Sequence, residues 1–462
     1  CPMSSPVLTF LGAAESVTGS KFLVDTGASR TLVDAGLYQG LADLRRRNWS
    51  PFPVPAGGIG AIVVSHAHLD HCGFLPRLVK EGFDGPILCS PDTAELVTIV
   101  LRDSAHLQEE DARQANAGGY TKHHPALPLY DLEDVERTLP LLTPTDFATE
   151  VDLAPDVRVV LQPAGHILGS STVLLETAGR RTLFSGDLGR GHHPILRAPA
   201  DPPAAHAVAV ESTYGDRRHP DRDPEVLAAA VRRTIGRGGT VLVPAFAVDR
   251  TELVLLELHQ LMAAELVSRV PVYLDSPMAL RALTVYREAL DSGSTQLRPD
   301  LDEVRAALDA MQVRAVPDAA GSMRLNRPDQ PCIVVSASGM VTGGRVVHHL
   351  AHQLPDPRNC VVLTGYQAVG TRGRQLLEGA RQLKIHGRYV PVRAEVVDVP
   401  HFSVHADADE IVGWLGRAPE PPEVVYVVHG EPAASQALAA RIRNDLGWCA
   451  VVPRLGERVR LD

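Results

Sequence analysis

Short hydrophobic runs, many of them rich in β-branched residues, alternate with loops and amphipathic stretches through the first 210 residues. Runs of this length and composition predict β-strands. The predicted strands are residues 21–24, 31–34, 61–65, 157–161, 171–176, 181–187 and 207–211. A polar and mainly helical stretch from about residue 91 to 140 separates the third strand from the fourth. The pattern indicates a multistranded sheet with flanking helices.

The pattern changes after about residue 222, where each hydrophobic run is followed by a loop and then by a segment of helix length. Repeated strand, loop and helix units build a parallel sheet with helices on its faces. The paired runs are 239–244 with 249–261, 270–275 with 278–290, 332–336 with 343–352, and 360–364 with 370–377. Two more pairs follow, at 393–399 with 408–415 and at 423–429 with 433–444.

This organisation predicts an α/β protein in which one domain is inserted into another. Residues 1–215 form the first part of the outer domain, 216–385 form an inserted domain with a parallel, doubly wound sheet, and 386–462 return to the outer domain. A chain of 462 residues with 45% hydrophobic content is long enough for two cores. A charged and then apolar leader is not found, and no apolar run approaches eighteen residues. We therefore expect a cytoplasmic protein that does not enter a membrane.

The net charge of −10 argues against a protein that coats nucleic acid through a broad basic face. It does not exclude a nuclease, because bound metal cations offset acidic ligands locally. The cysteines lack the paired spacing of a disulfide framework, and several lie in apolar runs, so reduced and mostly structural thiols are expected. The cysteines are Cys1, Cys72, Cys89, Cys332, Cys360 and Cys449.

The strongest chemical signal is a cluster of metal-ligand residue types directly after the predicted strand 61–65. It contains His66, His68, Asp70 and His71. Three imidazoles and a carboxylate within six residues cannot all face one side of a helix or strand, so a loop must bend them together. Zinc and manganese accept these donor atoms, and a hydrolytic site keeps coordination positions open for water and substrate. The cluster therefore predicts a catalytic metal centre.

Further ligands are expected from other strand ends. His166, Asp187 and His429 each end an apolar run and have glycine close by, which permits the tight backbone that such a site needs. A single histidine at a strand end is more often hydrogen-bonded in a core, but four such positions in one chain favour a shared metal site. Asp34 fits a carboxylate that orients a ligand imidazole. Its alternative is a turn-forming aspartate.

At these positions the sequence resembles the metallo-β-lactamase fold, an αββα sandwich with two metals at one edge. The supporting residues are His66, His68, Asp70 and His71 together with Asp34, His166 and Asp187. The rest of the chain resembles the β-CASP nuclease branch, and in particular the endonuclease subunit of the mRNA 3′-end cleavage complex and its bacterial relatives. Glu211, His405 and His429 match the three extra motifs of that branch. The runs 336–340 and 364–370 resemble its inserted domain, and Val404 is a small departure.

The resemblance implies two divalent metal ions, Zn²⁺ first and Mn²⁺ as the alternative. His66, His68 and His166 would hold one ion, Asp70, His71 and His429 the other, and Asp187 would bridge them. The implied activity is hydrolysis of single-stranded RNA by internal cleavage, with 5′-to-3′ trimming as a second mode, in RNA processing or decay. The resemblance also implies that a histidine at the third extra motif, here His429, indicates an RNA rather than a DNA substrate.

Phosphodiester hydrolysis also needs proton transfer. Asp70 can accept the proton of the attacking water as well as bind metal, and His405 is the candidate general acid for the leaving oxygen, with Glu211 fixing its ring. The alternative interpretation is that His405 is an ordinary residue at the N-terminus of a helix and takes no part in catalysis. Glycine-bounded loops that lead into helices suit phosphate groups. The polar side chains in these loops could equally well cap helices or be solvated at the surface. The RNA-contact candidates are Ser338, Arg372, Arg374 and Ser403.

Three other functions compete with this interpretation. A small-molecule hydrolase of the same fold needs neither the inserted domain nor Glu211 and His405. A non-catalytic RNA-processing scaffold would have lost ligands, whereas all seven are present here. A single-stranded DNA nuclease shares the metal chemistry. The sequence leaves the oligomeric state open, with a homodimer among the options.

Overall fold

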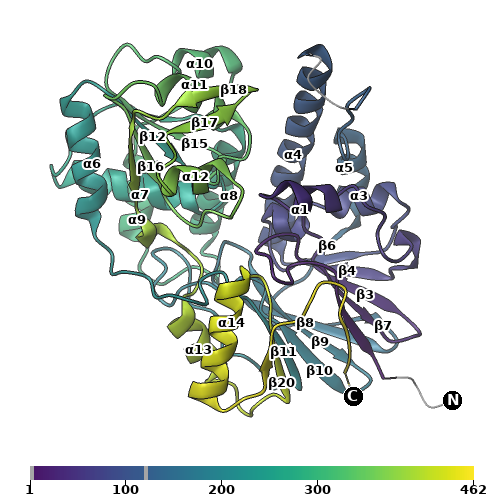
Figure 1. Ribbon diagram of the computed structural model, residues 1–462. Helices are drawn as coiled ribbons and strands as arrows, with labels where there is room; N and C mark the ends of the chain where they lie inside the picture. Colours follow the sequence, from purple (N-terminus) through teal and green to yellow (C-terminus); the bar gives the residue numbers. More distant parts are fainter. Residues whose placement is uncertain (1–4, 119–122, 462) are drawn as a thin grey trace. The chain divides into compact units, whose positions relative to one another are not determined.

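The computed structural model describes residues 5–118 and 123–461, so Cys1 lies outside the described residues. The chain forms two compact units, which are described one at a time (Figure 1). The first unit comprises Cys1–Gln39, Asp43–Arg218 and Val404–Asp462, and the second comprises Gly40–Ala42 and His219–Ser403.

Two seven-stranded sheets form the first unit. One sheet has the order β22-β1-β2-β3-β4-β5-β6 and the other has the order β21-β20-β11-β10-β9-β8-β7. The strands of the first sheet are β1 (Val7–Phe10), β2 (Phe22–Asp25), β3 (Arg30–Val33), β4 (Ala61–Val63), β5 (Ile87–Cys89), β6 (Leu142–Pro144) and β22 (Arg458–Arg460). Those of the second are β7 (Glu150–Ala154), β8 (Val157–Pro163), β9 (Ser171–Thr177), β10 (Arg180–Phe184), β11 (Ala207–Val210), β20 (Val424–Val427) and β21 (Ala450–Val451).

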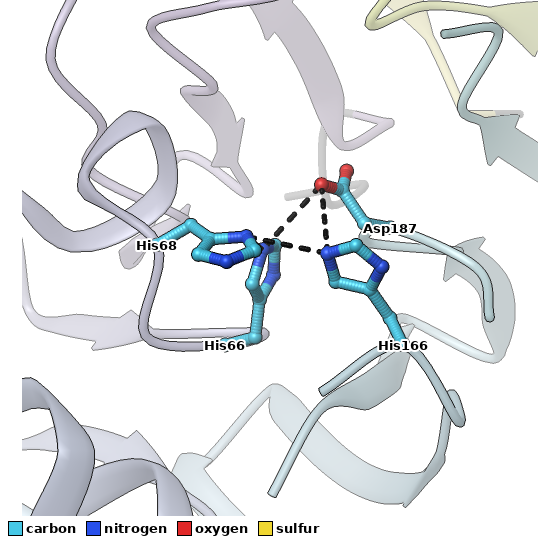
Figure 2. A group of neighbouring side chains, drawn as sticks. All are labelled: His66, His68, His166 and Asp187. Atoms are coloured by element: carbon cyan, nitrogen blue, oxygen red, sulfur yellow. Dashed lines mark hydrogen bonds and ion pairs between the residues drawn. The ribbon is translucent and has the colours of Figure 1, made fainter. Parts of the chain in front are cut away.

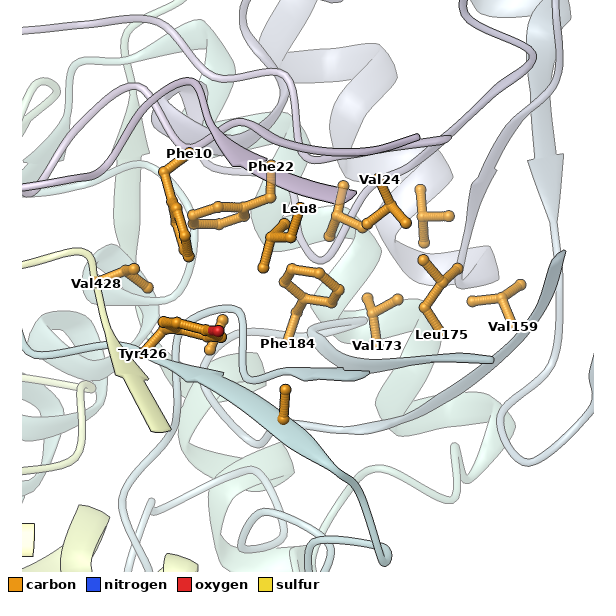
Figure 3. Close-up of a cluster of buried hydrophobic side chains, with 14 of the residues drawn as sticks. Leu8, Phe10, Phe22, Val24, Val159, Val173, Leu175, Phe184, Tyr426 and Val428 are labelled. Carbon is orange, nitrogen blue, oxygen red and sulfur yellow. The ribbon is translucent and has the colours of Figure 1, made fainter. Parts of the chain in front are cut away.

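The inner faces of the two sheets share one hydrophobic core (Figure 3). Phe22 of β2 and Phe184 of β10 pack together there, with their tilted rings 5.6 Å apart between centroids. Side chains alternate between the two faces of a strand, and β20 shows the consequence. Tyr426 points into this core, whereas Val425 and Val427 point to the other face and pack under helices. Every position of β20 is thus used, which explains its continuous apolar run.

Helices cover the outer faces of both sheets. α13 (Ala408–Leu415) and α14 (Pro432–Arg441) pack on the second sheet. On the other side, α4 (Pro91–Gly118) contacts β6 and also α5 (Leu132–Thr138), which packs on α3 (Leu75–Lys80). Short helices complete the unit; they are α1 (Ala42–Arg47), α2 (Leu69–Cys72), η1 (Ala56–Gly58), η2 (Leu139–Leu141) and η4 (Ile442–Leu446). The predicted αββα sandwich is confirmed.

The second unit contains a six-stranded sheet of order β14-β13-β15-β12-β16-β19, and every pairing in it is parallel. The strands are β12 (Thr240–Pro244), β13 (Val272–Leu274), β14 (Val313–Ala315), β15 (Cys332–Ser336), β16 (Cys360–Leu363) and β19 (Glu395–Asp398). A separate hairpin joins β17 (Gln382–Ile385) to β18 (Arg388–Pro391). The helices are α6 (Pro224–Gly236), α7 (Arg250–Ala263), α8 (Pro277–Ser292), α9 (Asp302–Ala310), α10 (Ala319–Arg324), α11 (Arg345–Gln353), α12 (Arg372–Leu377) and η3 (Pro400–Phe402). The predicted parallel α/β sheet is confirmed.

The domain boundaries differ in part from those expected. The first, expected after residue 215, lies after Arg218. The second, expected after residue 385, lies after Ser403 instead. The reason is β19, which was assigned to the outer domain but pairs in parallel with β16, with Cys360 opposite Glu395. A local apolar run predicts a strand, but it does not specify which strand supplies the hydrogen-bonding partner.

The described cysteines are all free. Cys72, Cys89, Cys332 and Cys360 are buried, and Cys449 is exposed, as expected of structural thiols. Among the described residues, none of the helices combines the length and the apolar character needed to cross a bilayer.

Candidate metal centre

Loops at one edge of the sandwich carry the candidate ligands. His66 and His68 follow β4, and the short helix α2 then presents Asp70 and His71. His166 lies in the turn between β8 and β9, where its backbone N–H donates to Ser170 Oγ at 2.9 Å. All of these side chains except His68 and Asp70 are almost completely buried. Several polar side chains are therefore buried together at this edge, a position at which apolar side chains would be expected.

Four side chains form the first group and point toward one another (Figure 2). His68 Nδ1 lies 3.1 Å from His66 Nε2 and 3.2 Å from His166 Nε2. Asp187 Oδ2 lies 3.4 Å from His66 Nε2 and 3.6 Å from His166 Nε2. Three ring nitrogens and one carboxylate oxygen thus converge on one point.

The electrostatics of this group suit a cation. Burial, together with the neighbouring imidazoles, lowers the pKa of His68 to about 3 and places that of His166 well below its usual value. Burial and then His71 also lower the pKa of His66. These rings are therefore neutral near pH 7 and can each offer a lone pair. Neutral imidazoles beside a carboxylate are the donor set of a divalent zinc or manganese site.

A second group joins Asp70, His71 and His429. His429 Nε2 lies 3.1 Å from His71 Nε2 and 3.6 Å from Asp70 Oδ2. Burial alone would raise the pKa of Asp70, but its contacts with His429 and His71 outweigh burial and lower it. Burial would lower the pKa of His71, yet the carboxylates of Asp187 and Asp34 raise it well above its usual value. The carboxylates of Asp70, Asp187 and Asp34 thus concentrate negative charge around this group. A divalent cation bound here would balance that charge.

Asp187 connects the two groups through its two carboxylate oxygens. Oδ2 faces His66 and His166, whereas Oδ1 lies 3.3 Å from His71 Nε2 and 3.4 Å from His429 Nδ1. One oxygen directed to each group is the arrangement of a bridging carboxylate. Asp187 is only 2% exposed and follows β10 closely, so the sheet fixes its position.

Asp34 lies behind His71 and does not join either group. Its Oδ2 is 2.7 Å from His71 Nδ1, and its Oδ1 accepts a hydrogen bond from the backbone N–H of Ser65 at 2.8 Å. The hydroxyls of Ser65 and Ser20 also donate to Oδ2, at 3.0 and 3.3 Å. The carboxylate therefore fixes the tautomer of His71 and directs its Nε2 toward the centre.

The backbone is strained where it delivers two of these side chains. Asp34 and His429 have φ values of 60° and 51°, in the left-handed region that non-glycine residues rarely adopt. Gly36 lets the Asp34 loop approach the ligand loop, because a Cβ at this position would lie 1.5 Å from the carbonyl oxygen of Asp70. The surrounding fold holds this costly backbone geometry at the site.

His405 and Glu211 lie beside the first group. His405 Nδ1 is 3.2 and 3.3 Å from the two carboxylate oxygens of Glu211, and 3.8 Å from Asp187 Oδ2. Glu211 is fully buried and also accepts from the backbone N–H of Leu188 at 2.6 Å. The His405 side chain is 14% exposed, and its ring centroid is 4.4 Å from that of His166. A partly exposed imidazole is thus held at the edge of the centre by a rigid carboxylate.

Comparison with known proteins assigns the chain to a family. Residues 17–230 match the metallo-beta-lactamase superfamily, 251–376 match the Beta-Casp domain, and 389–453 match the Zn-dependent metallo-hydrolase RNA specificity domain. Ribonuclease TTHA0252 of Thermus thermophilus is 36% identical over 429 residues, which are 92% of this chain and 94% of that protein. The chain belongs to the β-CASP family of the metallo-β-lactamase superfamily. The resemblance drawn from its motifs is confirmed.

Other β-CASP relatives carry different names. An RNase J-like protein of Methanocaldococcus jannaschii is 30% identical over 458 residues, 97% of this chain and 98% of that protein. The transcription termination factor FttA of the same organism is 30% identical over 474 residues, 98% of this chain and 71% of that protein. A crystal structure of an Enterococcus faecalis protein of unknown function shares the fold, with a TM-score of 0.52 at 13% identity over 99% of this chain and all of that one.

Three polar residues of this β-CASP chain support the centre although the sequence did not single them out. Ser65 contacts both Asp34 and His66 Nδ1, the latter at 3.1 Å. Thr213 Oγ1 lies 3.2 Å from His429 Nδ1. Ser170 caps the turn of His166. Each lies within four residues of a candidate residue, and proximity to the motifs was the only signal that could have indicated them.

The four residues expected to contact the RNA backbone belong to the second unit of the β-CASP chain. Arg372 donates to the carbonyls of Val341, Thr342 and Lys384, and Arg374 donates to Glu378 and to the carbonyl of Gln367. Ser338 Oγ accepts from the backbone N–H of Thr342, and the hydroxyl of Ser403 is buried. Ser338, Arg372 and Arg374 are partly exposed and already have partners within the protein, and contact of the four residues with RNA stays a prediction.

A buried lysine supports the loops behind the second group. Lys21 is 4% exposed, and its Nζ donates to the carbonyls of Gly36 and Gly19. Burial lowers its pKa from 10.5 to about 7. The rings of Tyr38 and Phe74, with centroids 4.6 and 4.8 Å from Nζ, favour the charged form and offset part of this effect.

We expect Lys21 to make stability depend on pH. Between about pH 7 and 10.5 the unfolded chain binds the lysine proton and the native protein does not, so the free energy of unfolding rises with pH. The slope is up to about 1.4 kcal/mol per pH unit. Urea titrations of the wild type and Lys21→Met, carried out from about pH 6 to about pH 10, isolate the effect as their difference. A difference that does not change with pH would contradict it.

Proposed function

We propose that this chain is a two-metal ribonuclease that hydrolyses phosphodiester bonds of single-stranded RNA. The observation that carries the proposal is the double group around Asp187, with one carboxylate oxygen directed to each set of histidines. His66, His68 and His166 would hold one cation, and Asp70, His71 and His429 the other. The nitrogen-rich donor set favours Zn²⁺ over Mg²⁺, and Mn²⁺ is the alternative.

Divalent cations bound here would neutralise charge on the phosphoryl oxygens and lower the pKa of water from about 15.7 to near 7. The protein supplies the remaining functions. Asp70 keeps its carboxylate ionised through its contacts with His429 and His71, so it can accept a proton from the attacking water. Asp34 holds the His71 ring in place through a contact of 2.7 Å.

His405 is the proposed general acid. Glu211 contacts Nδ1 with both carboxylate oxygens, which leaves Nε2 of the partly exposed ring as the proposed proton donor. A proton on Nε2 can then pass to the leaving sugar oxygen as the bond to phosphorus breaks. Glu211 is itself held by a hydrogen bond from the N–H of Leu188, which helps to orient the imidazole.

RNA is the proposed substrate for two reasons. Relatives that align over nearly the whole chain are named a ribonuclease and an RNase J-like protein. The chain also contains a region matching an RNA specificity domain. A small-molecule hydrolase would use neither Glu211 nor His405, yet both are built into the centre. The proposed location is the cytoplasm, where RNA processing and decay provide such substrates.

A competition assay tests the substrate assignment. The protein, saturated with Zn²⁺ or Mn²⁺, is incubated with a circular single-stranded RNA, the matching circular DNA and a chromogenic β-lactam. We expect the RNA circle to open, because opening requires internal cleavage, while the DNA circle and the lactam stay intact. Preferential opening of the DNA circle would assign a DNA nuclease, and turnover of the lactam alone would assign a small-molecule hydrolase.

A further inference from the structure

One segment of the second unit contains basic residues and no acidic ones. Residues 381–393 contain Arg381, Lys384, Arg388 and Arg393 and no aspartate or glutamate, although the whole chain has a net charge of −10. This segment contains the hairpin of β17 and β18 (Figure 1). A short basic segment in an acidic protein points to an anionic partner at that place.

The hairpin directs its charged and apolar side chains to opposite sides. Leu383, Ile385 and Val390 join the hydrophobic core of the second unit, which anchors the hairpin. Lys384 and Tyr389 are paired across the two strands and both are exposed, Tyr389 by 67%. An exposed tyrosine next to a lysine combines a flat apolar ring with a positive charge.

Helix α11 lies beside the hairpin and adds two exposed imidazole rings, His348 and His352. The ring of His348 stacks on that of His386 with 4.6 Å between centroids and 29° between planes. His348 and His352 are both exposed, and α11 contains no acidic residue. Burial and then the electrostatic effect of His348, Arg372 and His352 lower the pKa of His386, so this ring offers a neutral, stacked surface near pH 7.

Arg372 joins the hairpin to a neighbouring loop. Its Nε donates to the carbonyl of Lys384 at 3.1 Å, and its Nη1 donates to the carbonyls of Val341 and Thr342 at 3.1 and 3.3 Å. The hairpin is therefore fixed to the loop that follows β15, where Ser338 bonds to Thr342. Its exposed side chains are presented by a rigid support rather than by a mobile tip.

We propose that this face, called here the hairpin surface, binds the single-stranded RNA substrate through residues that take no part in the metal centre. The lysine and arginine would contact phosphates, and Tyr389 would stack on a base, a combination that binds single strands without sequence preference. This proposal rests on the proposed function, because it names a second contact for the same RNA. The hairpin surface consists of Lys384, His386, Arg388, Tyr389, His348 and His352.

The test compares charge reversal at two places. Lys384→Glu with Arg388→Glu changes the hairpin surface, and Arg454→Glu with Arg460→Glu makes the same change of charge at exposed positions near β22 of the first unit. Tyr389→Ala tests stacking separately. Binding of a fluorescent single-stranded RNA of about 20 nucleotides, long enough to extend beyond a single contact site, is measured over a range of salt concentrations. A chelator is present so that cleavage does not compete.

We expect the hairpin reversal to weaken binding about tenfold or more at low salt and to reduce the salt slope by about 1.4, since each phosphate contact on a single strand contributes about 0.7. Tyr389→Ala should weaken binding about tenfold with little change in slope. The control reversal should bind as the wild type does. In cleavage assays with metal, the hairpin reversal should raise KM for the long RNA, leave kcat unchanged, and leave kcat/KM unchanged for a short oligonucleotide.

Two results would overturn the proposal. One is a hairpin reversal that binds and cleaves long RNA as the control reversal does. The other is unchanged RNA affinity with a changed molar mass in light scattering, which would make the hairpin surface a contact between protein chains. Absence of any cleavage by the wild type would count against the proposed function instead, and the binding titration would still decide whether the hairpin surface takes RNA.

Discussion

Replacing Asp187 with alanine is expected to remove both proposed cations and to reduce RNA cleavage on the order of 10⁴-fold or more, an effect of the size seen when a central catalytic group is lost. The expectation follows from its position, because each carboxylate oxygen faces a different group of histidines. Elemental analysis of the wild type after saturation with Zn²⁺ should give about two equivalents per chain. Asp187→Ala should retain almost none.

Asp152→Ala is the matched control, since Asp152 is an exposed carboxylate on β7 whose side chain is 76% accessible. It should keep the metal content and activity of the wild type. Circular dichroism and chromatography confirm that both variants fold. Full metal content in Asp187→Ala would refute the bridging role, and full activity with reduced metal would refute the two-metal mechanism.

Replacing His405 with alanine is expected to lower kcat for RNA by about 10²- to 10⁴-fold while the metal content stays unchanged. His405 belongs to neither histidine group but forms, with Asp187 and Glu211, a third group of possible ligand atoms in which its Nδ1 is 3.8 Å from Asp187, so metal content is measured alongside activity. The measurement is single-turnover cleavage together with elemental analysis. Loss of metal would assign His405 to ligation instead.

A substrate with an activated leaving group separates proton transfer from other roles of His405. A nitrophenyl phosphodiester expels an oxygen that needs no proton, so His405→Ala should cleave it nearly as fast as the wild type does. Glu211→Gln should shift the pH profile of RNA cleavage and leave the nitrophenyl reaction largely unchanged, because the amide still contacts the ring but carries no charge. An equal loss on both substrates would show a structural role and remove the general-acid assignment.

The sequence indicated most of the side chains that the structure brings together, because the main motif is local. Three imidazoles and a carboxylate within six residues are hard to account for without a shared cation, and the remaining candidates follow strands whose ends meet at one edge of the sandwich. The family match later confirmed the fold that these residues implied. Asp34 was assigned to the support of a ligand, and its contact with His71 agrees with that role.

Features that depend on distant partners were not predictable in the same way. The strand near residue 395 was expected, but its pairing with β16 moves it to the other unit. The arginines at 372 and 374 were candidates for RNA contact, yet their guanidinium groups bond to carbonyls and to Glu378. The sequence around an arginine does not show whether its guanidinium group forms hydrogen bonds within the folded protein or is available to a ligand. The serines that surround Asp34 were missed for the same reason.

The position of His429 in the chain has a consequence for synthesis. It meets His71 at 3.1 Å although 358 positions separate them, and the entire second unit is translated between the two except for Gly40–Ala42. A growing polypeptide that is still attached to the ribosome therefore carries most of the proposed ligands long before the last one emerges. Until then the second group lacks one of its three side chains, so the proposed two-metal centre can form only after the second unit has been synthesised.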